Sequence, residues 1–133
     1  MLSINYNLSL SPFGSPRKLR RCKSKRYLGF IAAKLCIVCG ALSTVHHLIR
    51  GRTRNKRSGD LLTLPLCEKH HTGYEHGIDG RLGGNWAAFE KLHNLNIIEI
   101  VLGYWQEYFE LNNWNGSFDS QEALDLFVME HES

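Results

Sequence analysis

The chain has 133 residues, enough for one compact domain with a tail, and 43% of them are apolar, as in an ordinary globular protein. No apolar run approaches the ~20 residues that cross a bilayer, and the first sixteen residues lack the basic start and long apolar core of a secretory signal. We therefore expect a cytoplasmic protein without a membrane segment.

Charge is divided unevenly along the chain. The net charge is only +3, but residues 1–59 hold thirteen Lys and Arg and no acid, whereas residues 60–133 hold three Lys and Arg and thirteen acids. Basic side chains that neutralise phosphates release counterions, which is the main source of sequence-independent nucleic-acid affinity. The N-terminal half is therefore expected to favour polyanions.

Two basic runs, at 17–26 and 50–57, flank the segment that is rich in cysteine and histidine. One short run is usually only a solvated face, but two runs around one segment favour nucleic acid. Neither carries a base-reading signature, so we expect contacts to the phosphate backbone and weak sequence preference. The candidate DNA contacts are Arg20, Arg21, Arg50, Arg52, Arg54, Lys56 and Arg57.

Apolar periodicity predicts helices toward both ends of the chain and two short strands in its middle. In chain order, the predicted elements are a basic flexible leader (1–22), a helix (about 23–34), strands (43–49 and 61–66), a short glycine-broken helix from Glu68, and helices at 86–93, 97–111 and about 120–130. This mixture defines an α+β fold. We divide it into the leader, a core over 23–95, and a C-terminal helical extension over 96–133 that packs on the core.

The predicted helix over 97–111 carries two apolar stripes. The stripes consist of Ile97, Val101, Tyr104, Tyr108 and Leu111, and of Ile98, Leu102, Trp105 and Phe109. A helix that is apolar on two faces is normally buried in a core or in an oligomer interface. We favour the core, and therefore a monomer or a weak homodimer.

Three of the four cysteines lie close in sequence to five of the seven histidines. Cys36 and Cys39 form one closely spaced pair, and Cys67 and His70 form another, with 27 residues between the pairs. Each pair can close on one metal, and together they supply the Cys₃His set that tetrahedral zinc favours. The spacing and the expected cytoplasmic location argue against disulfides. Cys22 is expected to be an uninvolved thiol.

His46 and His47 lie between the two pairs. Adjacent residues on a strand point to opposite faces, so both imidazoles cannot be buried in one apolar core. One can ligate a second metal while its neighbour approaches a phosphodiester from another direction. Hydrolysis of that bond needs a base that titrates near neutrality and a divalent cation that stabilises charge on the leaving oxygen. The pair therefore indicates metal-dependent phosphodiester hydrolysis.

Four segments resemble a known family: residues 27–36 (YLGFIAAKLC), 36–51 (CIVCGALSTVHHLIRG), 60–80 (DLLTLPLCEKHHTGYEHGIDG) and 86–93 (WAAFEKLH). They are similar to the HNH endonucleases of the Ref type, RecA-dependent phage nucleases, and to related phage proteins. The resemblance leaves out the leader and the C-terminal segment. It implies a small ββα-metal (HNH) core with a zinc knuckle, encoded by a phage or prophage and acting in DNA recombination in the host-cell cytoplasm.

Site residues follow from the resemblance position by position. It implies that His46 binds the catalytic metal, that His47 is the general base that activates water, and that His71 is a second metal ligand. Asp60 lies about where the family has a central Asn, the residue that holds the base in its tautomer. The structural zinc ligands implied by the resemblance are Cys36, Cys39, Cys67 and His70.

The sequence departs from the family after His71. A further His commonly completes the metal site, either four residues on or in a His-Gly-Ile-His run, but this chain has Glu75 and then HGID at 76–79. His76 and Asp79 could both ligate. We expect His76, with Asp79 as a close alternative because carboxylates suit Mg²⁺ and Mn²⁺ at least as well as imidazole does.

These features predict a metal-dependent DNA endonuclease with structural Zn²⁺ and catalytic Mg²⁺ or Mn²⁺, whose second site could also take Zn²⁺ in crystals. Its partners would be DNA and a RecA-type recombinase filament. The alternative is a non-catalytic zinc-knuckle module that binds nucleic acid, in which His46 and His47 only contact phosphates. Such a module has no need for His71 and Asp60 near His47, whereas a nuclease does. A structural partner in a recombination complex is a third possibility.

Overall fold

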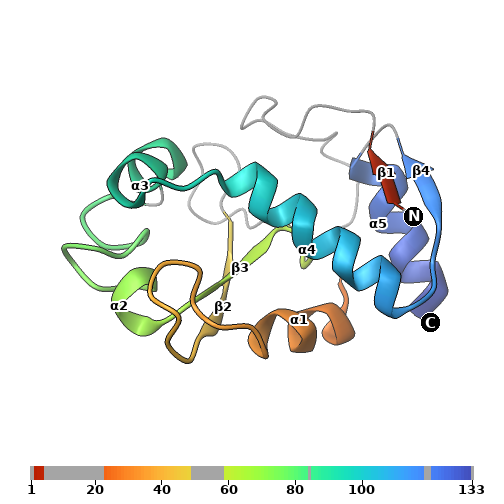
Figure 1. Ribbon diagram of the computed structural model, residues 1–133, viewed down its shortest axis with the longest axis horizontal. Helices are drawn as coiled ribbons and strands as arrows, with labels where there is room; N and C mark the ends of the chain where they lie inside the picture. Colours follow the sequence, from red (N-terminus) through yellow and green to blue (C-terminus); the bar gives the residue numbers. More distant parts are fainter. Residues whose placement is uncertain (1, 5–22, 49–58, 84, 119–120, 133) are drawn as a thin grey trace.

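The computed structural model describes residues 2–4, 23–48, 59–83, 85–118 and 121–132 (Figure 1). Within these ranges the elements are β1 (Leu2–Ile4), α1 (Lys25–Ala32), β2 (Thr44–His47), β3 (Thr63–Leu66), α2 (Glu68–His71), α3 (Trp86–His93), α4 (Ile97–Leu111), β4 (Gly116–Phe118) and α5 (Gln121–Glu132). The fold is mixed α/β, with β2 and β3 in one two-stranded sheet and β1 and β4 in another. No helix in these ranges is long and apolar enough to cross a membrane.

The strands β2 and β3 form an antiparallel pair that lies between α1 and α4 in the view of Figure 1. The register places His46 opposite Leu64 and His47 opposite Thr63. All four residues of β3 are buried, with α1 and α2 packed against this strand, whereas in β2 only His46 is buried. The helix α2 begins at Glu68, directly after Cys67, and its His71 ring lies 4.7 Å from the ring of His46 on β2.

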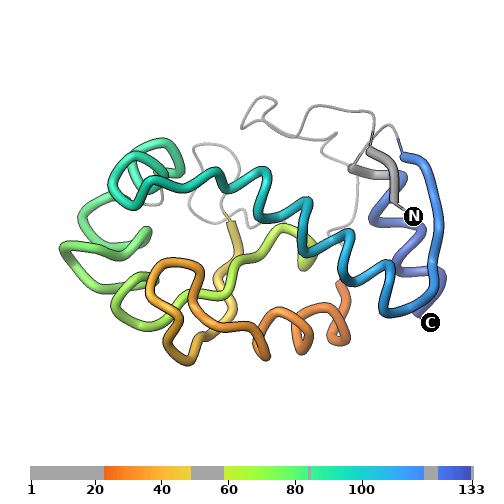
Figure 2. Tube along the Cα trace, in the orientation of Figure 1, coloured from red at the N-terminus to blue at the C-terminus, as the bar shows by residue number. Residues whose placement is uncertain are grey.

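The longest helix of the described chain, α4, lies on the side of this sheet away from α1 in the view of Figure 2. Its buried residues form one arc: Ile97, Val101, Trp105, Tyr108 and Phe109. The Trp105 ring N–H donates to the Leu61 carbonyl at 2.7 Å, which ties α4 to the segment before β3. The predicted helix over 97–111 and its burial in a core are confirmed. One arc faces the core instead of two stripes, and Leu111 at the helix end is 66% exposed.

The first and last described strands meet in the second sheet. Strand β1 pairs in parallel with β4, with Ile4 opposite Phe118. Residues 2–4 of the predicted leader are thus paired with a strand, and residues 5–22 of the leader lie outside the described residues. Strand β4 was not predicted. The ring of Phe127 on α5 lies 5.2 Å from Phe118 and 5.5 Å from Phe109, so α5 packs against β4 and α4.

The remaining predicted elements are present. The helix predicted over 86–93 is α3, which begins after Asn85, whose side chain accepts the Ala88 N–H at 3.0 Å. It ends at Asn94, which takes the left-handed conformation that asparagine tolerates at a helix end. The strands expected over 43–49 and 61–66 correspond to β2 and β3, and the short helix expected after them is α2.

Candidate metal centres and the His47 site

Three cysteines and a histidine form a compact group at the start of α2. The Cys39 and Cys67 sulfurs are 3.6 Å apart, and Nδ1 of His70 lies 3.6 Å from the Cys36 sulfur and 3.2 Å from the Cys67 sulfur. Ligands held tetrahedrally at about 2.0–2.3 Å from zinc would be about 3.3–3.8 Å apart, close to these distances, whereas a disulfide would bring two sulfurs to about 2.05 Å. The three cysteines are free thiols, and the group could hold a metal such as zinc.

The local backbone prepares this Cys₃His group for a metal. Gly40 takes a φ of 75°, and its N–H reaches the Cys36 carbonyl at 2.9 Å, which closes the turn between the first two ligands. Burial opposes ionisation of the Cys36 thiol, but backbone N–H groups, that of Cys67 foremost, lower its pKa. Burial lowers the pKa of His70. Thiolate and neutral imidazole are the species that bind zinc.

His46, His71 and Asp79 form a second group next to the first. One carboxylate oxygen of Asp79 lies 3.3 Å from Nδ1 of His46 and 3.2 Å from Nε2 of His71. Two ligands about 2.1 Å from one metal ion lie about 3.0–3.4 Å apart, so these distances fit a shared cation. The set of two imidazoles and one carboxylate suits a divalent transition metal or Mg²⁺.

The second group is buried at one end and open at the other. His46 is 3% exposed, whereas the Asp79 side chain is 31% exposed. Burial, together with the charges of His71 and His47, lowers the pKa of His46 to about 3. His46 is therefore neutral at physiological pH, as a metal ligand must be.

A compact loop after α2 places Asp79 next to His46 and His71. The N–H groups of Ile78 and Asp79 donate to the carbonyls of His70 and His71 at 3.0 Å and 2.8 Å, which folds the chain back onto the helix. Glycines make this return possible. A Cβ on Gly80 would lie 2.2 Å from the Gly73 carbonyl oxygen, closer than any side chain could approach.

The expectation that His76 completes the second group is not met. Its ring lies 6.4 Å from those of His70 and His93, and its carbonyl accepts a hydrogen bond from Nε2 of His93 at 2.9 Å. The physical reason is the return of the loop, which turns the chain between His76 and Asp79 so that only the latter faces His71. Asp79, the alternative third ligand, is the residue that the structure brings to His46.

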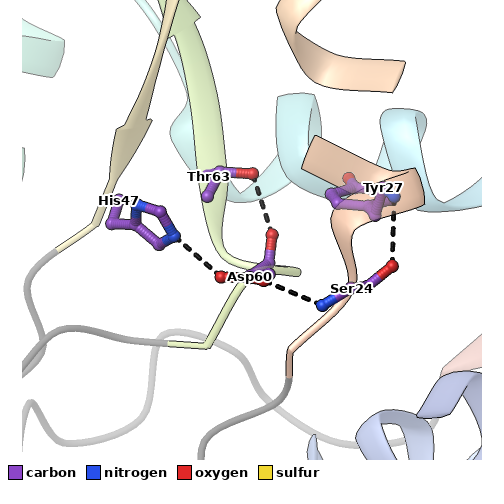
Figure 3. A network of polar contacts seen from close by, with 5 residues as sticks. All are labelled: Ser24, Tyr27, His47, Asp60 and Thr63. Carbon is purple, nitrogen blue, oxygen red and sulfur yellow. Dashed lines mark hydrogen bonds and ion pairs between the residues drawn. The ribbon is translucent and has the colours of Figure 1, made fainter. Parts of the chain in front are cut away.

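The second histidine of β2 faces a different partner (Figure 3). Nε2 of His47 lies 2.9 Å from Oδ1 of Asp60, whose other carboxylate oxygen accepts the backbone N–H of Ser24 at 2.8 Å. An ionised carboxylate can only accept, so Nε2 carries the ring proton and Nδ1 keeps a lone pair. Both side chains are partly exposed, at 20% for His47 and 16% for Asp60. Asp60 therefore lies against His47, the ring with which the family resemblance pairs it.

Sequence reasoning missed one contributor and proposed others that lie outside the described residues. The missed contributor is the backbone N–H of Ser24. Ser24 precedes an amphipathic helix, which is the pattern of an N-cap, but no sequence signal tells where its own N–H points. The predicted DNA contacts outside the described residues are Arg20, Arg21, Arg50, Arg52, Arg54, Lys56 and Arg57.

Fold and site together define a mixed α/β protein with a Cys₃His group that could hold a metal. A family model described as "Protein of unknown function (DUF968)" matches residues 2–98, and the chain belongs to this family. The match includes both ligand groups, His47 and Asp60. No curated protein and no solved structure matches the chain.

Proposed function

We propose that this protein is a metal-dependent DNA endonuclease in which β2, β3 and α2 form a ββα-metal core of the HNH type. The observation that carries the proposal is the placement of the doubled histidine. His46 belongs to the group with His71 and Asp79, while His47, the next residue, is oriented by Asp60. A cation site beside an oriented base is what phosphodiester hydrolysis requires.

In the proposed reaction, Nδ1 of His47 takes a proton from water as the water oxygen attacks the phosphorus atom. The bond from phosphorus to the leaving sugar oxygen breaks, and that oxygen takes up a proton from solvent. Asp60 accepts the Nε2–H throughout, which holds the ring in the tautomer that acts as a base and stabilises it once it is protonated. A divalent cation held by His46, His71 and Asp79 would stabilise negative charge on the phosphate and the leaving oxygen.

Positive charge near His47 supports a polyanionic substrate. Lys23 and Lys25 are exposed and flank Ser24, whose N–H is bonded to Asp60. The two basic runs add further positive charge to the same half of the sequence. We therefore propose DNA as the substrate, held through its phosphates. A RecA-type recombinase filament is proposed as a partner from the resemblance alone.

A non-catalytic zinc module that binds nucleic acid is the second candidate. The Cys₃His group favours this candidate, because it offers four ligands without any residue of the second group. It leaves two contacts without a role, namely the approach of His46 and His71 to the Asp79 carboxylate and the bond between His47 and Asp60. Hydrolysis uses both of them.

Plasmid nicking tests the proposal. We expect zinc-loaded protein to nick supercoiled plasmid with added Mg²⁺ or Mn²⁺ and not without it. His47→Ala should lower the rate about 10²–10⁴-fold, the usual contribution of a general base, with zinc content and melting temperature unchanged. The matched control is His76→Ala, an exposed histidine outside both groups, which should nick at the wild-type rate.

Two results would count against the proposal in different ways. Binding without metal-dependent cleavage of duplex, single-stranded or recombinase-coated DNA would favour the zinc module. Full activity in His47→Ala would reject His47 as the base while leaving hydrolysis itself standing.

A further inference from the structure

The hydrogen-bond network around Asp60 continues into the last helix. Ser24 donates its backbone N–H to Asp60 at 2.8 Å and its hydroxyl to the Glu132 carboxylate, 2.7 Å from Oε2 and in contact with Oε1 as well. Tyr108 on α4 donates its hydroxyl to the same carboxylate at 3.2 Å. Ser24 is only 4% exposed. Contacts therefore run without a break from Glu132 on α5 to His47 on β2.

The Ser24 hydroxyl is held from two sides. It accepts the Tyr27 N–H at 3.0 Å as the N-cap of α1, and it gives its own proton to Glu132 (Figure 3 shows the Tyr27 contact). A hydroxyl has one donor and two acceptor positions, so both bonds can form together. With its side chain held in this way, the backbone N–H of Ser24 points in one direction, and that direction is toward Asp60.

Glu132 is itself fixed by Tyr108. Burial, reinforced by the Glu132 charge, raises the pKa of Tyr108 to about 12, so its hydroxyl remains a hydrogen-bond donor at neutral pH. The Glu132 carboxylate therefore accepts from two hydroxyls that come from different elements, α1 and α4. It joins the beginning of α1 to the end of α5.

We propose that Glu132 is a positioning residue for the base of the proposed nuclease. By holding the Ser24 hydroxyl it aims the Ser24 N–H at Asp60, and Asp60 in turn aims His47. The inference rests on the proposed function for its catalytic meaning. Glu132 lies beyond residues 2–98, so in this chain a helix outside the matched segment supports a site built inside it.

The chain offers a matched control for general loosening of α1. Lys34, just after the end of that helix, pairs with Glu107 on α4. Glu107→Ala removes a carboxylate that ties down α1, as Glu132→Ala does, but it leaves the contacts between Ser24 and Asp60 in place. A merely structural role of Glu132 would make the two variants behave alike.

The tautomer of His47 is a readout that does not depend on activity. Ring ¹⁵N–¹H spectra of zinc-loaded protein report it, and His47→Gln identifies the signal. We expect the Nε2–H form in the wild type and a mixture of both neutral tautomers in Glu132→Ala. Ser24→Ala should give the same mixture, and the double variant no further change, because both act on one network.

Three variants should keep the wild-type tautomer. Glu132→Gln retains a side-chain oxygen that can accept the Ser24 hydroxyl, Ser24→Thr retains the hydroxyl, and Glu107→Ala leaves the network intact. If Glu132→Ala does not fold, the comparison of Ser24→Ala with Ser24→Thr decides the same question.

Nicking kinetics give a second readout. Glu132→Ala should lower kcat about tenfold, part of the 10²–10⁴-fold that a general base contributes, with KM within about twofold of wild type because no DNA contact is removed. Glu132→Gln and Glu107→Ala should stay near the wild-type rate.

The outcomes separate the inference from the function on which it rests. A wild-type His47 tautomer in folded Glu132→Ala, or an equal change in Glu107→Ala, overturns the positioning role of Glu132 even if the protein nicks DNA. A tautomer that depends on Glu132 supports the positioning role, and if the wild type then cleaves no DNA, only the nuclease proposal fails.

Discussion

The two ligand groups share the short helix α2 but differ in the number of coordination positions that they would leave free on a bound metal. The Cys₃His group offers four ligands, of which Cys36, Cys67 and His70 are buried. Four protein ligands complete a tetrahedral shell, as in structural zinc sites. The second group offers three ligands, and Asp79 is exposed. A cation held there would keep positions for water and phosphate, which supports assigning the first group to stability and the second to chemistry.

Loss of the first group should have the largest effect. Cys67→Ser removes a sulfur that lies 3.2 Å from His70 and 3.6 Å from Cys39. Structural zinc binds with an apparent free energy of roughly 10–16 kcal/mol, comparable to the whole stability of a domain. We expect loss of both bound zinc and the cooperative unfolding transition, measured by elemental analysis and circular dichroism.

Cys22→Ser is the matched control for that variant. Cys22 lies outside the described residues and is not needed for the four-ligand set, so zinc content and unfolding should match the wild type. Stoichiometric zinc in Cys67→Ser would show that the metal is held elsewhere.

Loss of the second group should stop the chemistry and spare the fold. Asp79→Ala removes the carboxylate shared by His46 and His71. Even outer-shell partners of a metal cost 10–100-fold when they are lost, so we expect Mn²⁺ affinity and nicking to fall about 100-fold or more, with structural zinc retained. Isothermal titration with Mn²⁺ and the nicking assay measure this. An equal loss of Mn²⁺ affinity and nicking in His76→Ala would mean that the third ligand has been assigned wrongly.

The loop glycines should give a smaller, graded effect on the second group. A Cβ on Gly80 would press on the Gly73 carbonyl, so Gly80→Ala should lower the unfolding free energy by about 1–3 kcal/mol and weaken Mn²⁺ binding through the adjacent Asp79. Gly103→Ala in α4 meets nothing within 4 Å and should instead stabilise by up to ~1 kcal/mol. Denaturant titration measures the unfolding free energies of the two variants. Wild-type Mn²⁺ affinity in Gly80→Ala would mean that the loop is less constrained than its packing indicates.

Local patterns were enough to predict the parts that depend on neighbouring residues. The helix over 97–111 follows from apolar periodicity, and in the structure the Asn96 side chain caps its first turn. The Cys₃His set follows from pair spacing, because two residues three apart at a turn must approach one another. The approach of Asp60 to His47 was implied by the family resemblance and not by a local pattern; the β2–β3 pairing, which sets His47 opposite Thr63, accounts for it.

Local patterns could not predict contacts between distant segments. Strands β1 and β4 have three residues each and are separated by most of the chain, so neither shows a usable period. The choice of Asp79 over His76 depends on the return of a glycine-rich loop, which spacing alone does not determine. The contact between Ser24 and Glu132 joins residues 108 positions apart and has no local sequence signal.

Consecutive residues of α2, His70 and His71, point into different centres because neighbours on a helix are turned by about 100° from each other. A consequence concerns changes in length. A point substitution can remove one centre at a time, but one residue inserted or deleted within 68–71 would rotate both imidazoles out of place together. Between Cys67 and Asp79, the number of residues should therefore be under as strong a constraint as their identities.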